Sequence, residues 1–290
     1  MPKVSVIIPT YNRPDLIGPA IQSVLDQTYK DFELIVVDDG VEERAEKVVK
    51  SFYDERIRYI QNEMSCGGGA ARNTGIKKAK GEFIAFLDDD DQWVPEKLEI
   101  QMEEFERTGE DVGFCFSAVT QKRDDGNKVS IVYNGEIEYY ETALKNVKGV
   151  LTSALIVKRE ALNVVGCLDE NFPSHQEAEL VIRLSKRYKG FGINKSLVSM
   201  IVYSNHVSIG KNLKNRIKGR EMMIKKHFKE YQKRPKILVF HYFQLGLFYR
   251  DFGETRKAKK YFIEALKIAP LNILYWKHLL YIVYKLTIRI

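Results

Sequence analysis

The chain has 290 residues, of which 44% are hydrophobic and 29% are charged. This composition is that of a globular protein with one large domain or two smaller ones, and it excludes disordered and fibrous chains. The three cysteines, Cys66, Cys115 and Cys167, lie far apart in the sequence. Their number and spacing exclude a disulfide scaffold and a paired-cysteine zinc site, and they fit a reducing compartment.

The net charge of +7 is distributed unevenly along the chain. Residues 205–290 contain 20 Lys and Arg against 5 Asp and Glu, a net of +15, so the rest of the chain stands at −8. A basic, aromatic-rich C-terminal region suits nucleic acid, an anionic membrane surface or an anionic partner. Because no motif for reading nucleic acid accompanies it, we expect no nucleic-acid partner.

The ends of the chain suggest no export or membrane-spanning signal. The N-terminal apolar run is too short for a signal peptide, and no 18 consecutive residues are apolar and uncharged. We therefore expect a cytoplasmic protein, with peripheral contact to the cytoplasmic membrane face as an option for its basic C-terminal region.

Strand and helix signals alternate over the first 90 residues. Strands are expected at 4–8 (ended by Pro9), 32–37, 57–61 and 83–87, and helices at 14–27, 42–53 and 70–79. This alternation predicts an α/β fold with a mixed, mainly parallel sheet flanked by helices. Ligands of such sheets bind at the carboxyl ends of the strands.

The order of elements changes after residue 91. We expect helices at 95–108 and 177–189, a hairpin of strands 112–120 and 129–133 with its turn at 124–127, and further strands at 151–157 and 197–203. The predicted organisation is a domain at 1–204, a basic surface helix or linker at 205–235, and a small helical tail at 236–290.

The tail resembles one tetratricopeptide-like helical hairpin. Its small and large positions fall at the offsets of that repeat: Tyr242, Leu245, Gly246, Tyr249, Ala258, Phe262, Ala265 and Pro270. One repeat cannot bury its own apolar face. It must pack on the preceding domain, on the last helix at 271–290, or on a second copy in a homo-oligomer. That last helix either caps the hairpin or lies in a membrane interface.

Four consecutive aspartates, Asp88, Asp89, Asp90 and Asp91, follow the strand expected at 83–87. Carboxylates this close repel one another, and a bound cation would relieve the repulsion. Because side chains alternate near a strand end, Asp88 and Asp90 are expected to point the same way. Their oxygens suit Mn²⁺ or Mg²⁺, which would also bind a substrate's phosphates. The alternative is a solvated acidic turn.

Weaker signals accompany the other strand ends. Asp38 and Asp39 end the second strand, where a carboxylate can accept hydrogen bonds from a ribose or a base. Tyr11 either stacks on a base or is a half-buried aromatic at the rim. The glycines at 67–69, before Arg72, either bring backbone N–H groups and a guanidinium to an anion or form a simple loop.

Together these segments resemble the family 2 glycosyltransferases, which have the GT-A fold. The resemblance covers about residues 3–205 and is carried by four motifs in the family's order: VSVIIPTYNR at 4–13, VVDDG at 36–40, GGGAARNTG at 67–75 and FLDDDDQW at 86–93. It implies a nucleotide-diphosphate sugar donor, with UDP as the favoured nucleotide, a divalent metal ion, and inversion at the anomeric carbon. The acceptor would be a hydroxyl of a glycan or of a lipid-linked molecule.

The resemblance also implies roles for individual residues. Asp90 would be the main metal ligand with Asp88 in support, and Asp89 would face the ribose. Tyr11 and Asp39 would contact the base. The other residues expected at the donor are Pro9, Arg13, Asp38, Gly68 and Arg72. A histidine at the position of His206 would reach the metal or the pyrophosphate.

The base that this family needs is usually the Asp of a Glu-Asp pair at the start of a helix. Here Gln176 and Glu177 occupy that place, so Glu177 is the expected base. The longer side chain moves its carboxylate by ~1 Å, a displacement that matters for attack on the sugar. Glu179 is the rival candidate. In the alternative reading both acids only favour a helix N-terminus.

The departure at Gln176 keeps a second functional reading open. A non-catalytic nucleotide-sugar-binding or scaffold protein would use the same fold and work through its helical tail. A nucleotidyltransferase is less compatible, because residues 10–14 do not form the basic, glycine-rich loop that such enzymes place after the first strand.

Overall fold

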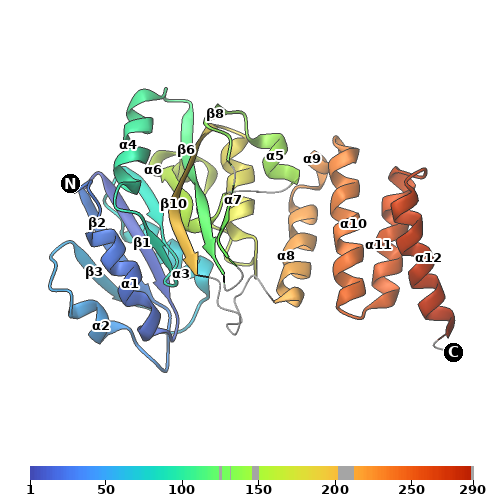
Figure 1. Ribbon diagram of the computed structural model, residues 1–290, viewed down its shortest axis with the longest axis horizontal. Coiled ribbons are helices and arrows are strands. Elements are labelled where there is room, and N and C mark those ends of the chain that lie inside the picture. The colour runs from blue at the N-terminus through green and yellow to red at the C-terminus, as the bar shows by residue number, and fades with distance from the viewer. Residues whose placement is uncertain (124–125, 131, 146–149, 202–211, 289–290) are drawn as a thin grey trace. The chain divides into compact units, whose positions relative to one another are not determined.

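The computed structural model describes residues 1–123, 126–130, 132–145, 150–201 and 212–288. The chain divides into two compact units (Figure 1). The first comprises Met1–Ala143, Val147–Glu170 and Gln176–His206, and the second comprises Leu144–Asn146, Asn171–His175 and Val207–Ile290. The domain boundary expected at 204/205 lies outside the described residues, as does His206. In the described part of the chain no helix is both long enough and apolar enough to cross a membrane.

The first unit is built on one mixed sheet, with the strand order β3-β2-β1-β4-β9-β6-β10-β5 and with β7 beside β6 and β8 beside β10. The strands are β1 Val4–Thr10, β2 Phe32–Asp38, β3 Ile57–Gln61, β4 Phe83–Phe86, β5 Asp91–Trp93, β6 Val112–Lys122, β7 Lys128–Val129, β8 Gly135–Ile137, β9 Leu155–Lys158 and β10 Lys189–Ile201.

Strands β3, β2, β1 and β4 are all parallel, so their carboxyl ends lie along one edge of the sheet. Strand β9 joins β4 and β6 in antiparallel fashion, and β6 and β10 are parallel. The predicted α/β class with a mixed sheet is therefore confirmed. The expected strand end at Pro9 is wrong, because β1 continues to Thr10. Strand β4 ends opposite Ile7, so Pro9 lies beyond it and pairs only with β2.

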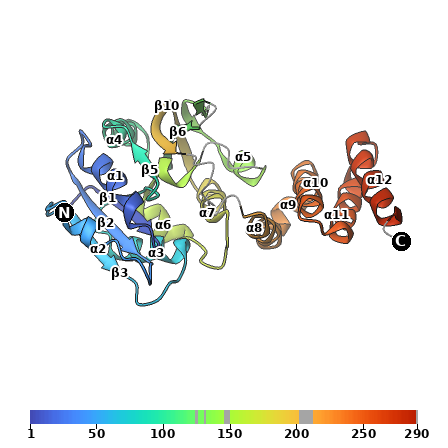
Figure 2. The ribbon, with the colours of Figure 1, turned by 60° about the horizontal axis from the view of Figure 1, so that its bottom comes forward.

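Helices cover both faces of this sheet (Figure 2). The helices up to Ser185 are α1 Pro14–Leu25, α2 Glu46–Lys50, α3 Gly68–Lys78, α4 Lys97–Arg107, α5 Tyr140–Lys145, α6 Arg159–Val165 and α7 Gln176–Ser185, with a 3-10 turn at Thr152–Ala154. Pro14 opens α1, where its fixed φ suits the first helical turn. The apolar side of α1, with Ile17, Ile21 and Val24, packs into the same core as Val6 and Ile8 of β1.

Several further elements differ from the structure. The helix predicted at 177–189 ends at Ser185, and Lys189 already begins β10. The helix predicted at 42–53 forms only over Glu46–Lys50, and the strand predicted at 151–157 begins with the 3-10 turn. The strand predicted at 197–203 is the end of the longer β10, whose earlier residues pair with β6 and β8. Each difference depends on contacts that are distant in the sequence. The antiparallel pairing of the predicted hairpin is confirmed, since β6 and β7 pair antiparallel, but its second strand spans Lys128–Val129 and not 129–133.

The second unit is helical. It contains α8 Leu213–Lys226, α9 Phe228–Gln232, α10 Pro235–Asp251, α11 Thr255–Ile268 and α12 Ile273–Ile288. Helix α8 is more than a solvated linker, because Ile217, Met223 and Ile224 are buried. Helices α10 and α11 form a tight hairpin, in which a Cβ atom on Gly246 would lie 2.5 Å from Phe262 Cε1.

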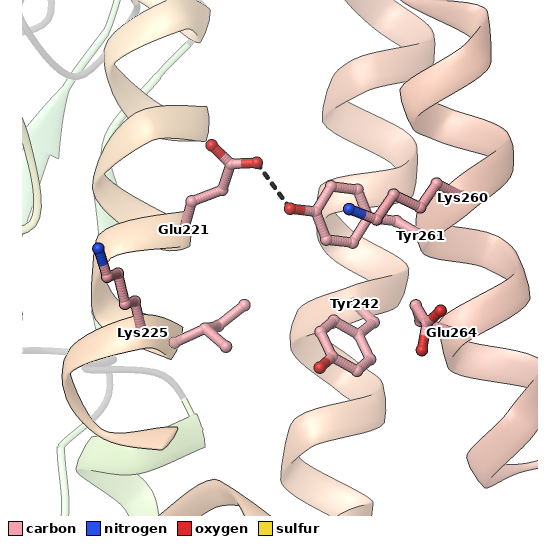
Figure 3. A pocket seen from close by; sticks show the side chains of 7 residues that line it. Glu221, Lys225, Tyr242, Lys260, Tyr261 and Glu264 are labelled. Atoms are coloured by element: carbon pink, nitrogen blue, oxygen red, sulfur yellow. Dashed lines mark hydrogen bonds between the residues drawn. The ribbon is translucent and has the colours of Figure 1, made fainter.

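An open hollow of about 260 Å³ lies between α8, α10 and α11 (Figure 3). It is lined by Glu221, Ile224, Lys225, Tyr242, Lys260, Tyr261 and Glu264. Tyr249 and Tyr261 stack with ring centroids 5.5 Å apart, and both phenols donate to Glu221 Oε1, at 2.8 and 2.6 Å. These bonds tie α8 to the hairpin.

Candidate active site

The candidate site lies where the parallel strands β1, β2 and β4 end. The register aligns Thr10 of β1 with Asp38 of β2, and Ile7 of β1 with Phe86 of β4. The polar residues that directly follow β2 and β4 therefore converge at this edge. This is the place where ligands bind in open α/β sheets.

Asp38 organises the loop after β2. Its side chain is buried, with Oδ1 accepting from Gly40 N at 2.9 Å and Oδ2 accepting from Ala45 N at 2.8 Å and from the Tyr59 hydroxyl at 2.7 Å. These partners hold the turn that leads into α2. Since protein groups already occupy both oxygens, contact between Asp38 and a nucleotide stays a prediction.

Asp39 holds a second loop against the sheet edge. It accepts hydrogen bonds from Asn62 Nδ2 at 2.7 Å, Ser65 Oγ at 2.9 Å, Cys66 N at 3.0 Å and Gly67 N at 2.8 Å. Burial alone would raise the pKa of Asp39, but these donors hold it below its ordinary value. Asp39 is thus an ionised anchor for the glycine-rich start of α3, and its contact with a base stays a prediction.

The four aspartates after β4 alternate in environment, as predicted. Asp89 and Asp91 are buried, whereas the side chains of Asp88 and Asp90 are 33% and 31% exposed. Burial raises the pKa of Asp89 to about 7 and that of Asp91 to about 8, and repulsion from neighbouring carboxylates adds to both rises. The carboxylates of Asp88 and Asp90 are open to a ligand. Asp89 instead accepts from Thr10 Oγ1 at 2.7 Å and pairs with Arg13, so its contact with a ribose stays a prediction.

Two arginines counter this negative charge. Arg13, in the loop after β1, places Nη2 2.6 Å from Asp89 Oδ1 and Nη1 3.2 Å from Asp90 Oδ2. Arg72, on α3, forms an ion pair with Asp88. Its Nε is buried without a hydrogen-bond partner among the described residues. The structure thus brings the predicted residues Arg13, Arg72, Asp88 and Asp90 into one charged cluster.

The remaining residues expected at the sugar-nucleotide donor lie at the end of β1 and at the start of α3. Pro9 is buried within β1, opposite Val37, whereas Tyr11 is 48% exposed just beyond the strand. Gly68 opens α3, and a Cβ there would lie 3.2 Å from Arg72 Nη1. A side chain at Gly68 would therefore crowd the guanidinium.

The start of α7 lies beside the start of α3. A Cβ on Gly69 would lie 2.7 Å from Gln176 Nε2, so the glycine permits this close approach. Glu177, in the first turn of α7, is within electrostatic range of Arg72 and Asp88. Burial raises the pKa of Glu177 and repulsion from Asp88 adds to it, while Arg72 opposes the rise. The expected base is thus half-buried next to the aspartate cluster.

The rival acid, Glu179, has a structural role. It is buried and forms an ion pair with Arg183, with Nη2 and Oε2 2.8 Å apart. The same guanidinium donates to the carbonyl oxygens of Val165, Gly166 and Cys167. Glu179 therefore anchors the loop before α7, and Glu177 remains the candidate base.

Two polar residues of the site were not predicted from the sequence. Ser153 Oγ accepts from Asp88 N at 3.1 Å and donates to Asp91, and Asn73 Nδ2 donates to Glu170 Oε1 at 2.8 Å. Through these hydrogen bonds Ser153 stabilises the turn that contains the aspartates, and Asn73 holds the loop that precedes α7. Nothing in the sequence marks Ser153 as part of the site, because it is a single serine before an apolar run. Asn73 could have been recognised, because it lies within the GGGAARNTG motif.

The open carboxylates could bind a divalent metal ion, but the described side chains do not supply a complete set of ligands for one. Among the described residues, no three His, Cys, Asp or Glu side chains group as metal ligands. Asp88 and Asp90 offer two hard oxygen donors in a cluster that excess negative charge destabilises. This set fits Mg²⁺ or Mn²⁺, which commonly takes one or two carboxylates and completes its shell with water and substrate phosphates.

Comparison with known proteins places these observations in a family. Residues 5–166 match the model of glycosyl transferase family 2. A putative teichuronic acid biosynthesis glycosyltransferase, TuaG of Bacillus subtilis, is 33% identical over 216 residues, which cover 72% of this chain and 83% of that protein. The UDP-Glc:alpha-D-GlcNAc-diphosphoundecaprenol beta-1,3-glucosyltransferase WfaP of Escherichia coli is 32% identical over 214 residues, covering 73% and 82% of the two chains.

Solved structures share the fold. TarS 1-349 of S. aureus in complex with UDP-GlcNAc superposes with a TM-score of 0.70 at 18% identity, over 92% of this chain and 81% of that chain. The mannosyltransferase PcManGT of Pyrobaculum calidifontis, in complex with GDP-Man and Mn²⁺, gives a TM-score of 0.63 at 17% identity, over 98% and 84%. At these identities the likeness shows the fold, which is the GT-A fold expected from the sequence.

Proposed function

Because the chain belongs to glycosyl transferase family 2, we propose that it moves a sugar from a UDP-sugar to a hydroxyl of a lipid-linked glycan acceptor, with inversion at the anomeric carbon. One observation carries the proposal: the Asp88–Asp91 cluster, its two arginines and Glu177 converge where the parallel strands end. The names of two similar proteins, WfaP and TarS with UDP-GlcNAc, support UDP as the nucleotide.

The donor's diphosphate is proposed to lie over Asp88 and Asp90. These carboxylates would hold Mn²⁺ or Mg²⁺, which when bound neutralises charge on the departing diphosphate. The Mn²⁺ in the PcManGT complex supports this choice. Arg72 would turn from Asp88 toward the phosphates, where a guanidinium binds oxygen anions well. Tyr11, half-exposed at the rim, would stack on the base.

Glu177 is proposed to act as the general base. Its carboxylate takes the proton of the acceptor hydroxyl as that oxygen forms a bond to the anomeric carbon. The bond from the anomeric carbon to the diphosphate oxygen breaks on the opposite face, and the nucleotide diphosphate leaves. A single displacement of this kind inverts the configuration. His206, outside the described residues, stays a predicted contact of the metal or the pyrophosphate.

The helical hairpin α10–α11 is proposed to be a tetratricopeptide-like repeat. The contact of Gly246 with Phe262, and the burial of Ala258 and Ala265, support this assignment. We favour catalysis over the non-catalytic alternative because Glu177, in spite of the unusual Gln176, carries a carboxylate within electrostatic range of Arg72 and Asp88.

A transfer assay tests the proposal. The full chain is incubated with Mn²⁺, a set of UDP-sugars and a short-chain polyprenyl-diphosphate GlcNAc acceptor, and products are followed by mass spectrometry and NMR. We expect UDP release coupled to a product with inverted anomeric configuration, and loss of product in Asp90→Ala. The matched control, Asp31→Ala, removes an exposed carboxylate before β2 and should keep the parent rate. A product of retained configuration, or Asp90→Ala at the parent rate, contradicts the proposal.

A further inference from the structure

Helix α12 has apolar side chains on both of its faces. One face packs on the hairpin: Leu279 and Ile282 are buried, and the ring of Tyr275 lies 4.6 Å from that of Phe243, centroid to centroid. The rest of the helix surface and the residues leading into it expose eight apolar or aromatic side chains: Leu271, Ile273, Leu274, Trp276, Leu280, Tyr281, Val283 and Tyr284. The other exposed residues of the described helix are Lys277, Lys285 and Thr287.

This exposed face is too apolar for one that stays in water. Leu280 is 62% exposed and Tyr284 65%. A surface helix of a globular protein normally carries one apolar stripe, and contiguous apolar patches on a protein surface mark interaction sites. The capping role expected for this helix uses only the stripe around Leu279 and Ile282. We therefore expect the exposed face of α12 to be covered by a partner.

The charges on α12 indicate what that partner is. The helix contains no Asp or Glu, and its two lysines, Lys277 and Lys285, are both exposed. The residues from 205 onward carry a net of +15. Two copies joined through this face would bring their lysines together without acidic partners on α12. An anionic lipid surface instead offers negative headgroups to the lysines and an apolar layer to the other side chains.

The aromatic residues fit the same partner. Tyr281 and Tyr284 are exposed, and Lys285 Nζ lies 5.0 Å from the ring centroid of Tyr281. Trp276 is 46% exposed while its indole N–H donates to Pro270 O at 2.8 Å. Side chains with an apolar body and a polar tip concentrate at membrane–water interfaces.

We propose that α12 lies in the plane of an anionic membrane surface, with its exposed face among the lipids. The apolar and aromatic side chains enter the boundary between headgroups and acyl chains, and Lys277 and Lys285 contact anionic headgroups. This binding does not depend on the donor site. A failure of the transfer assay would therefore leave it standing, and the reverse also holds.

Vesicle flotation of the full chain tests the proposal. Vesicles of phosphatidylcholine alone are compared with vesicles that also contain phosphatidylglycerol, at low and high salt. We expect the anionic vesicles to bind at least about tenfold more protein, with less bound at high salt. Leu280→Ser combined with Tyr284→Ser should weaken binding about tenfold or more, since both side chains leave water on binding.

A matched pair of exposed residues in the first unit is the control. Tyr133 is 62% exposed and Val164 60%, so Tyr133→Ser combined with Val164→Ser removes similar exposed surface and should bind like the parent. Lys277→Glu combined with Lys285→Glu should abolish the preference for anionic vesicles, with an unchanged Tm. The proposal fails if the parent does not float, or if the Leu280/Tyr284 variant floats like the parent. It also fails if sedimentation shows a dimer that this variant dissociates while no form binds vesicles, because the face then belongs to a second copy.

Discussion

Glu177 is the residue whose chemistry distinguishes transfer from simple binding. We expect Glu177→Gln to lower the rate of sugar transfer by about 10²–10⁴-fold, because the amide cannot accept the acceptor's proton. The affinity for UDP should stay near that of the parent, since the aspartate cluster is unchanged. Initial rates and calorimetric UDP titrations measure the two effects separately. Glu160→Gln, which alters the first turn of α6, is the control.

The pH dependence provides a second readout of the same residue. Burial raises the pKa of Glu177 above its ordinary value of 4.5. A base works only when deprotonated, so transfer should be full above the raised pKa and fall as the pH drops through it. The acid limb of the parent should therefore lie at higher pH than that of an ordinary glutamate. A Glu177→Gln enzyme with the parent's rate and the parent's acid limb would show that another group is the base.

At the scale of single residues, the carboxylates of the site could be predicted from the sequence, but the side chains that hold them in place could not. The aspartates after β4 stand next to one another in the chain, so strand alternation predicted that Asp88 and Asp90 point the same way, and the structure adds that these two are the more exposed. Ser153 reaches Asp88 and Asp91 from more than 60 residues away. Its position follows from how β9 joins the sheet, which no local pattern revealed. The structural roles of Asp38 and Glu179 likewise depend on distant partners.

At the scale of elements, sequence patterns predicted the bounds of a helix or strand correctly where no distant side chain intervenes. The strand Ile57–Gln61 has the predicted bounds. The helix expected from residue 42 starts only at Glu46, because Asn12 Oδ1 accepts from the backbone N–H groups of Val41 and Glu42, and Asp38 accepts from that of Ala45. These side chains hold the segment as a loop. The strong apolar periodicity of residues 42–53 could not reveal this.

The tight crossing of α10 and α11 makes its own prediction. Gly246→Ala should lower the free energy of unfolding by about 1–3 kcal/mol, because the added Cβ would lie 2.5 Å from Phe262 Cε1. This cost exceeds the gain in helix propensity, which is at most about 1 kcal/mol. Urea denaturation of the full chain measures the change.

Shortening the opposing side chain is the control for this crossing. In Gly246→Ala combined with Phe262→Leu, the smaller side chain leaves room for the Cβ, so the two costs should sum to more than the cost of the double variant. Strictly additive costs would show that Gly246 and Phe262 do not constrain each other, and would remove this contact as support for a tetratricopeptide-like hairpin.

At the scale of the whole molecule, the chain joins two units of opposite character. The sheet-containing unit holds the acidic cluster and the residues proposed for chemistry. The helical unit carries the excess positive charge and the apolar face of α12. We infer a division of tasks, with donor chemistry in the first unit and attachment to an anionic surface in the second. The charge asymmetry already pointed to two tasks, while the exposed second face of α12 became evident only from the burial of its residues.

Calorimetric titration of UDP into the full chain, with and without Mn²⁺, tests most directly whether the aspartates hold a metal that binds the donor's diphosphate. We expect Mn²⁺ to raise UDP affinity in the parent, and Asp90→Asn to weaken Mn²⁺-dependent binding by about tenfold or more. The exposed Asp31→Asn should titrate like the parent. Equal UDP affinity with and without Mn²⁺, unchanged in Asp90→Asn, would contradict a metal-assisted donor site at the end of β4.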